Sequence, residues 1–247
     1  MSSSSSSSSS SFGYPDFQVD AALLENLHLP DDPIKSVRGV QLVGILDRVL
    51  SERIFNSPFW KERCFSLSLA SLVDAVVAVV DAVGCCFGNF NTPTPFVCLL
   101  LKLLQLAPSI RVACELLFQP KHSYLRCLGA LYLRLVSPGP LVYQLLEPFL
   151  VDFRRIRERG TDGGMSVTHV DSFIDSLLSH DSVCGVALPR LTKRHALENS
   201  HQLPLRVTPL EEHDLKEFGI QNLSRVTTAS AQHHHLHDPP FKKSRVI

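Results

Sequence analysis

Prolines and glycines divide the central part of this chain into apolar segments that have the length of helices. Between residues 37 and 210 the apolar side chains recur every three or four positions, and no segment alternates between apolar and polar residues for long. The first pattern is typical of amphipathic helices, whereas half-buried strands would require the second. The sequence therefore predicts an all-α fold, with a single compact multi-helix domain over residues 37–210.

The expected helices follow from the positions of these breakers. Thr94 and Pro95 precede the most apolar segment, where a threonine can cap a helix and a proline can occupy its first turn. Pro108 ends that helix, and Ser109 can cap the next one. Helical spacing covers residues 37–54, 66–83, 96–106, 109–118, 124–136, 141–159, 168–178 and 183–199, with a short helical turn at 59–65.

Two of these segments carry more specific signals. The segment 141–159 contains Pro148, which predicts a kink or a restart, and it ends in basic residues before Gly160, a typical helix terminator. Thr168 and Asp171 resemble a capping box, so we expect the following helix to begin at Thr168.

The two flanks differ from this domain in composition. Residues 1–36 begin with a methionine and ten serines, and such a polar segment does not bury enough apolar surface to fold. We expect a disordered Ser-rich N-terminal arm over residues 1–36, with one short helix near 21–29. Residues 211–247 are polar and contain a histidine cluster at 233–237, which predicts a flexible C-terminal tail.

Charge and cysteine content exclude several classes of protein. The chain of 247 residues has 24 basic and 24 acidic side chains, so the protein as a whole does not attract nucleic acid. Its seven cysteines form no C-x-x-C pair, which favours reduced thiols and a cytosolic or nuclear compartment. Charged residues and prolines interrupt the apolar runs, and the serine tract does not resemble a secretory signal, so we expect a soluble protein.

The sequence lacks the motifs of catalysis and cofactor binding. It has no glycine-rich phosphate loop, no G-x-S-x-G elbow and no H-E-x-x-H pair. The histidines at 233–237 would hold a transition metal only loosely without a folded frame. Cys184 could be paired with His169 or His195 as a nucleophile, but such pairs arise by chance in a chain with seven cysteines and eleven histidines. We predict no enzyme, no cofactor and no metal, and we keep a Cys-dependent hydrolase as a third hypothesis.

Two groups of side chains indicate binding instead. One concentrates positive charge in the C-terminal third, where it can meet phosphates or an acidic partner. The other flanks predicted loops, where an exposed aromatic ring can anchor a partner. Solvated helix ends and core packing are the simpler interpretations of the two groups. The basic residues are Arg154, Arg155 and Arg157 with Arg190, Lys193 and Arg194, and the aromatic ones are Trp60, Phe87 and Phe90.

Several motifs follow one another in collinear order through the predicted domain. They are RIFNSPFWKERCF at 53–65, PTPFVCL at 93–99 with KLLQ at 102–105, YLRCLGALYLRL at 124–135, LEP at 146–148, DFRRIR at 152–157, HVDSFID at 169–175 and LPRLTKR at 188–194. Together they resemble the pre-mRNA-splicing factor 38 family over roughly residues 37–210.

This resemblance implies a function as well as a fold. It implies an all-helical nuclear domain of the U4/U6.U5 tri-snRNP and the precatalytic spliceosome, needed for spliceosome activation, in which other proteins unwind U4 from U6. It implies a protein-binding scaffold without catalysis of its own, whose partners include a zinc-finger splicing factor and a microfibrillar-associated-type helical protein. Contact with snRNP RNA would be mostly indirect. The chain departs from the family in its glycine-rich loop, which is reduced to Gly84 and Gly88, and in lacking a long charged tail.

Our first hypothesis is therefore a non-enzymatic spliceosomal scaffold. Its partner surface would involve Trp60, the loop at 87–94 and the basic residues at 154–157, while Tyr124, Arg126, Arg134 and Glu147 would be buried and structural. The alternative is a protein that binds the RNA backbone directly through the basic face at Arg190, Lys193 and Arg194.

Overall fold

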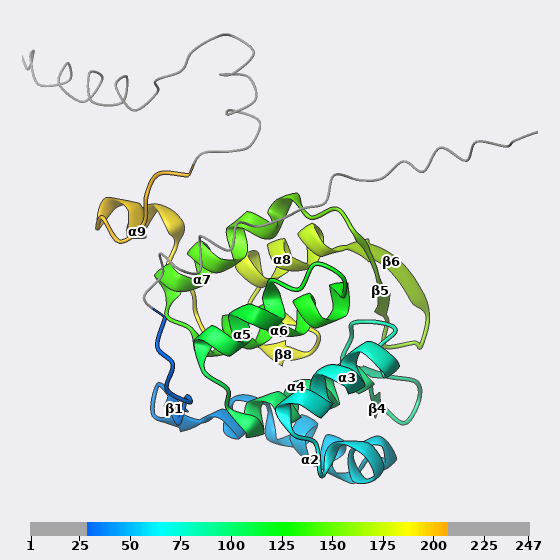
Figure 1. Cartoon of the computed structure of the whole chain (residues 1–247). Coiled ribbons are helices and arrows are strands. Elements are labelled where there is room, and N and C mark those ends of the chain that lie inside the picture. Colours follow the sequence, from blue (N-terminus) through cyan, green and yellow to red (C-terminus); the bar gives the residue numbers. More distant parts are fainter. Residues whose placement is uncertain (1–28, 207–247) are drawn as a thin grey trace, which may run out of the picture. The chain divides into compact units, whose positions relative to one another are not determined.

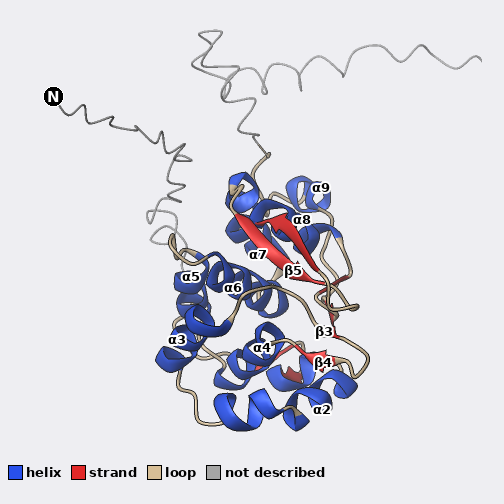
Figure 2. Cartoon of the chain, turned by 90° about the vertical axis from the view of Figure 1, so that its right-hand side faces the viewer, coloured by secondary structure: helices blue, strands red, loops and turns tan. Residues whose placement is uncertain are grey.

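The structure, a computed structural model, describes a mostly helical part of the chain (Figures 1 and 2). This part is residues 29–206. Most of its helices pack around one large apolar core, and α9 (Arg194–Asn199) contributes to a second, small cluster of Tyr143, Leu197 and Leu203. The prediction of a mostly helical domain is confirmed. The α-helices are α2 Arg48–Asn56, α3 Leu69–Val79, α4 Pro95–Leu106, α5 Ile110–Leu117, α6 Ser123–Val136, α7 Gly139–Leu146, α8 Val170–Ser179 and α9 Arg194–Asn199. Shorter turns are the 3-10 helices η1 Leu42–Ile45 and η3 Glu147–Val151 and the π-helical turn η2 Trp60–Cys64.

Short antiparallel strand pairs connect these helices. The pairs are β1 Ser36–Val37 with β2 Val40–Gln41, β3 Cys86–Phe87 with β4 Thr92–Pro93, β5 Arg155–Arg159 with β6 Met165–His169, and β7 Ser182–Val183 with β8 Val186–Ala187. None of these strands was predicted. Most are two residues long, too short to show a period of two in the sequence.

The centre of the core is formed by α4 and α6. In α4 every residue from 96 to 104 is buried, and in α6 every residue from 125 to 136 is buried. A helix that is buried on all sides must be surrounded by other elements, and α3, α5 and α8 supply them. Within residues 29–206 no helix is both long enough and apolar enough to span a membrane.

The predicted helix boundaries at α4 and α5 are confirmed. The side-chain oxygen of Thr94 accepts a hydrogen bond from the Val97 backbone N–H, and Pro95 occupies the first turn of α4. The Ser109 hydroxyl accepts from the Val112 backbone N–H at the start of α5. Thr94 also donates to the backbone carbonyl of Gly84, at 2.7 Å, and so ties the start of α4 to the preceding loop.

The predicted helix over residues 37–54 is wrong in its first half. The segment forms β1, β2 and η1, and the helix α2 begins only at Arg48. Arg38 and Gly39 both have positive φ, of 53° and 80°, which produces the tight turn between β1 and β2. The prediction counted the spacing of the apolar residues without the glycine that interrupts them.

The predicted helix over residues 141–159 is also wrong beyond Pro148. The helix α7 ends at Leu146, η3 follows, and residues 155–159 form the strand β5. Gly160 therefore does not cap a helix, because its N–H donates to the Gly164 carbonyl in the turn between β5 and β6. Alternation of Arg155, Ile156 and Arg157 explains the strand, since only the isoleucine is buried.

Smaller differences affect two other segments. The capping box at Thr168 is wrong, because Thr168 lies in β6 and His169 precedes α8 without a side-chain cap. The segment 183–199 is not one helix but the pair β7–β8 followed by α9. Residues 1–28 of the predicted arm at 1–36, most of the short helix at 21–29 and the tail at 211–247 lie outside the described residues. In the described end of that arm, Leu29 is buried in the core and Ser36 belongs to β1, so these residues pack on the domain. The predicted domain boundaries stay predictions.

Candidate protein-interaction surface

The hairpin of β5 and β6 pairs with one residue of the loop after α3. Val83 donates its N–H to the Arg157 carbonyl and accepts from the Arg159 N–H, both at 2.8 Å. Gly84 follows with a φ of 147°, and a Cβ there would lie 2.7 Å from the Arg159 carbonyl oxygen. The close approach of the two backbones therefore requires glycine at this position.

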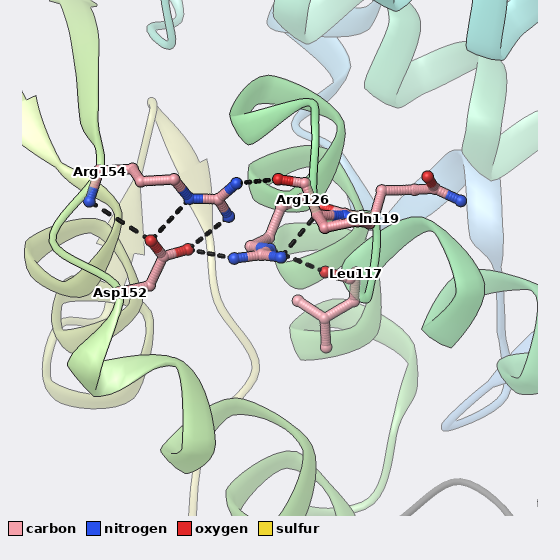
Figure 3. A network of polar contacts seen from close by, with 6 residues as sticks. Leu117, Gln119, Arg126, Asp152 and Arg154 are labelled. Carbon is pink, nitrogen blue, oxygen red and sulfur yellow. Dashed lines mark hydrogen bonds and ion pairs between the residues drawn. The ribbon is translucent and has the colours of Figure 1, made fainter. Parts of the chain in front are cut away.

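A buried ion-pair network fixes the start of β5 (Figure 3). The Asp152 carboxylate is 2% exposed and lies between the guanidinium groups of Arg126 and Arg154. Arg126, from the first turn of α6, also donates to the carbonyls of Leu117 and Gln119, each at 3.0 Å. Arg154 donates to Asp152 at 2.8 and 2.7 Å and also to the Pro120 carbonyl. Each charge has hydrogen-bonding partners, which a buried charge requires.

This network separates the predicted arginines into two groups. Arg154 is partly buried and is held by Asp152, so its guanidinium is part of the fold. Arg155 and Arg157 are exposed, and in residues 29–206 neither forms an ion pair. Arg159 lies over the ring of Phe87, at 4.6 Å from the ring centre, and contacts Asp81 at 3.4 Å. Two of the three predicted arginines are therefore available on the surface.

The three predicted aromatic residues also differ in exposure. Trp60 is only 5% exposed and packs edge-on against Phe55, with 5.2 Å between ring centres. Phe87 is partly buried under Arg159. Phe90 is 95% exposed at the turn between β3 and β4. Of the three rings, Phe90 is the one that a partner can cover without unfolding the domain.

Two surface grooves lie beside these exposed residues. The first, of about 450 Å³, lies between α2 and the β3–β4 turn and is lined by Val49, Arg53, Pro58 and Phe90, among others. The second, of about 270 Å³, is lined by valines of α3 and the following residue and by basic side chains. Its valines are Val76, Val77 and Val80, and its basic residues are Lys121, His122 and Arg155. The Gly88 N–H donates to the Thr161 carbonyl, so the β3–β4 turn touches the β5–β6 turn.

The residues predicted for RNA contact lie around the start of α9. Arg190 and Lys193 are exposed. Arg194 is different, because it forms ion pairs with Glu147, at 2.5 and 3.1 Å, and with Glu198. The hydroxyl of Tyr143 donates to the Thr192 carbonyl at 3.0 Å and anchors the same segment. Arg194 is thus engaged in holding α9 to η3.

The residues expected to be structural do serve the fold. Arg126 and Arg134 are buried, and Arg134 donates from Nε to the Leu177 carbonyl at 2.8 Å. Tyr124 is partly buried, donates to the Asp81 carbonyl and accepts from the Arg157 N–H. Sequence reasoning missed Asp152, the acidic partner of this arrangement. Its signal is a single carboxylate between the apolar segment 149–151 and an arginine run.

The model of the PRP38 family matches residues 35–201, about two thirds of the chain. The chain belongs to the PRP38 family.

Relatives of this PRP38 family member are named as splicing factors. Pre-mRNA-splicing factor 38 of Arabidopsis thaliana is 40% identical over 182 residues, which are 73% of this chain and 51% of that protein. Pre-mRNA-splicing factor 38A is 41% identical in Xenopus laevis and 40% identical in Homo sapiens, in each case over 72% of this chain and 56% of the relative. The chain thus spans about half the length of the curated relatives that it matches.

A solved structure resembles this PRP38 family member as well. It is the crystal structure of the Snu23-Prp38-MFAP1(217-258) complex of Chaetomium thermophilum. The similarity covers 77% of this chain and 97% of that chain, with 43% sequence identity and a TM-score of 0.68.

The cysteines of this PRP38 family member are buried or partly buried. Burial raises the pKa of the Cys184 thiol to about 12, so the thiolate that a nucleophile requires is scarce at neutral pH. This opposes the Cys-dependent hydrolase. Between residues 29 and 206 there is also no group of three or more histidine, cysteine or acidic side chains that could hold a metal ion.

Proposed function

We propose that this PRP38 family member is a non-catalytic, nuclear scaffold of the spliceosome that works by binding other splicing factors. In this proposal it belongs to the U4/U6.U5 tri-snRNP and the precatalytic spliceosome and is required for spliceosome activation. One observation carries the proposal. The chain is 43% identical to a chain of the crystallised Snu23-Prp38-MFAP1(217-258) complex, in which Prp38 is bound to two other proteins. Its partners are accordingly a Snu23-like zinc-finger splicing factor and a helical protein of the MFAP1 type.

The geometry supports a surface for these partners around the β3–β4 turn and the β5–β6 hairpin. Phe90 offers a nearly free aromatic ring beside a groove, which is the kind of side chain that anchors an interface. Arg155 and Arg157 add exposed positive charge. Trp60, which we predicted for this surface, lies in the core, so a contact of its ring with a partner stays a prediction.

A pull-down with the purified chain and recombinant Snu23-like and MFAP1-type partners tests this surface. Phe90→Asp combined with Arg155→Glu is the variant of choice, because both side chains are exposed and the fold does not depend on them. We expect at least one partner to lose about tenfold or more in affinity, as interface anchors typically show. Arg190→Glu, another exposed arginine, is the matched control. Wild-type affinity of the double variant for every partner would refute the surface, and failure of the wild-type chain to bind any partner would refute the function.

Direct RNA binding is the second candidate, because Arg190 and Lys193 are exposed basic residues close together in the sequence. It predicts an RNA affinity that falls steeply with salt concentration, with a slope set by the number of phosphates contacted. Charge reversal at both residues would flatten that slope. A complex that is insensitive to salt, or no complex at all, would remove this candidate.

A further inference from the structure

The outer edge of β6 presents backbone groups that point away from the hairpin. In an antiparallel pair, the N–H and C=O of one residue point to the same side, and this side alternates along the strand. The Arg157 carbonyl and the Arg159 N–H face Val83, away from β6. Their cross-strand neighbours Val167 and Met165 must then direct their own N–H and C=O away from β5. His169, two residues further, follows the same rule.

The two outer edges of this hairpin differ in whether other segments form hydrogen bonds with them. The edge of β5 is covered, because Val83 pairs with it and the Tyr124 hydroxyl accepts from the Arg157 N–H. At the edge of β6, the outward N–H and C=O groups of Met165 and Val167 form no hydrogen bond with another segment within residues 29–206. His169 is different, because it is the N-cap residue of α8 and its carbonyl belongs to the first turn of that helix. Figure 1 shows β6 at the margin of the folded part, with β5 between it and the helices.

This edge also lacks the devices that normally prevent a strand from pairing with another chain. Natural edge strands are blunted by proline, by lysine, by a bulge or by a covering loop. The strand β6 has the sequence Met-Ser-Val-Thr-His and pairs with β5 in regular register over all five residues. Met165 is 44% exposed and Val167 is 66% exposed. An apolar edge of this kind is suited to receive an added strand.

Charge indicates what kind of strand this edge would receive. Arg155 and Arg157 lie directly opposite His169 and Val167, so their side chains emerge on the same face as the exposed valine. Both arginines are exposed, and neither forms an ion pair within residues 29–206. A strand added beside β6 would have its own side chains next to Val167, within reach of the long guanidinium side chains. Acidic residues on that face are the complementary choice.

We propose that the free edge of β6 binds an extended segment of a protein partner as a third strand, with acidic side chains flanking an apolar one on the face of Arg155 and Arg157. The proposal rests on the proposed scaffold function in so far as it requires a protein partner. A second copy of this chain fits less well, because pairing of β6 with β6 would bring Arg155 and Arg157 of both copies onto one face, where like charges repel.

A synthetic peptide provides the probe. The acetylated and amidated heptapeptide Thr-Glu-Thr-Val-Thr-Glu-Thr places two glutamates and a valine on one face when it is extended. Its binding to the full chain is measured by fluorescence anisotropy. One control peptide replaces both glutamates with lysine, and another carries N-methyl groups on every second amide, on the hydrogen-bonding edge. We expect saturable binding of the acidic peptide, and at least about tenfold weaker binding of either control, as strand addition with charge complementarity requires.

Two variants test the same edge from the side of the protein. Val167→Pro removes an outward N–H but no bond to β5, because proline is tolerated on the free side of an edge strand. Its matched control is Val167→Thr, which keeps the N–H and a β-branched side chain. Arg157→Glu keeps the edge and reverses the charge, so it serves even if Val167→Pro does not fold. We expect Val167→Pro to lose peptide binding, Val167→Thr to keep it, and Arg157→Glu to prefer the lysine peptide.

Several outcomes would overturn the inference. Equal binding of the N-methylated peptide, or full binding by a folded Val167→Pro variant, would show that the backbone edge is not used. Equal binding of the lysine peptide would refute the acidic partner. A dimer in light scattering that Val167→Pro abolishes, without peptide binding, would assign the edge to a second copy. If the edge fails in these tests while the chain still captures splicing factors in the pull-down, the proposed function stands and only this inference falls.

Discussion

The buried carboxylate of Asp152 shows how much one residue can organise in this fold. It receives hydrogen bonds from two arginines that lie 26 positions before it and two positions after it in the sequence. Through Arg126 and Arg154, it connects α6, the loop after α5 and the start of β5. Ion pairs that are buried in this way are costly to break, because a lone charge remains in the interior.

We therefore expect Asp152→Ala to destabilise the protein strongly. Removing the carboxylate breaks the buried ion pair between Asp152 and Arg126, and the expected loss is about 3–5 kcal/mol in the free energy of unfolding. Urea denaturation followed by circular dichroism measures this difference. Arg48→Ala is the control, because it breaks an exposed pair with Glu52 and should cost at most about 0.5 kcal/mol. A loss for Asp152→Ala no larger than this would contradict the account of the network.

The thiols form a second test at the scale of single residues. Burial raises the pKa of Cys64 to about 11 and that of Cys85, Cys98, Cys114 and Cys184 to about 12. We expect the four thiols with a pKa of about 12 to react with iodoacetamide at mildly alkaline pH roughly a thousandfold more slowly than free cysteine, and Cys64 roughly a hundredfold more slowly, because the thiolate is the reactive form. Mass spectrometry after a timed reaction reads this out. The unfolded chain is the control and should be modified rapidly at all of its cysteines, whereas rapid modification of Cys184 in the folded chain would reopen the hydrolase hypothesis.

At the scale of elements, the sequence predicted correctly the helix starts that depend on local hydrogen bonds. Thr94 and Ser109 cap helices through hydrogen bonds to residues three positions later, so their effect is visible in the sequence itself. The strand β5 depends instead on a distant residue, because Val83 supplies its outer hydrogen bonds. The run of arginines at 154–159 contains one apolar position, and this is too weak a signal to distinguish a strand from the polar end of a helix.

Gly129 of α6 allows this helix to approach α5 closely. A Cβ on Gly129 would lie 2.8 Å from the backbone nitrogen of Leu117. We expect Gly129→Ala to lower the free energy of unfolding by about 1–2 kcal/mol, since the overlap between the helices outweighs the better helix propensity of alanine. Thermal and urea denaturation measure the change.

Gly139, at the first position of α7, provides the control for this substitution. A Cβ there would meet the nearest atom, of Leu191, at 3.6 Å, which is an ordinary contact. Gly139→Ala should therefore be neutral or slightly stabilising. If Gly129→Ala behaves in the same way, the two helices have room to move apart and the close approach is not essential.

At the scale of the whole molecule, the balanced charge hides two separate basic surfaces. Arg155 and Arg157 lie in β5, whereas Arg190 and Lys193 lie just before α9. We expect Arg155→Glu with Arg157→Glu to weaken the capture of splicing-factor partners by about tenfold or more. Arg190→Glu with Lys193→Glu, which changes the net charge by the same amount, should leave the capture unchanged. Pull-down titrations with both double variants decide this, and equal losses would mean that net charge, and not a particular surface, governs binding.

The candidate surface could be predicted from the sequence only in part. The motifs that resemble the splicing factor 38 family indicated the family, and the match over residues 35–201 confirmed it. The same motifs did not distinguish residues that hold the fold from residues that face a partner. Trp60 is buried in the core and Arg154 is held by Asp152, while Phe90 and Arg155 are exposed. Tertiary packing decides this difference, and the spacing of residues along one chain does not record it.

The open edge of β6 has a consequence for how the protein can exist by itself. The exposed edge at Met165 and Val167 offers backbone groups with which another unfolded polypeptide can pair, including nascent or misfolded copies of this chain. Molecules in excess of their partner would thus aggregate through this edge. A balanced production of this chain and of the protein that binds the β6 edge would prevent the aggregation. In the laboratory, co-expression with such a protein should improve the soluble yield.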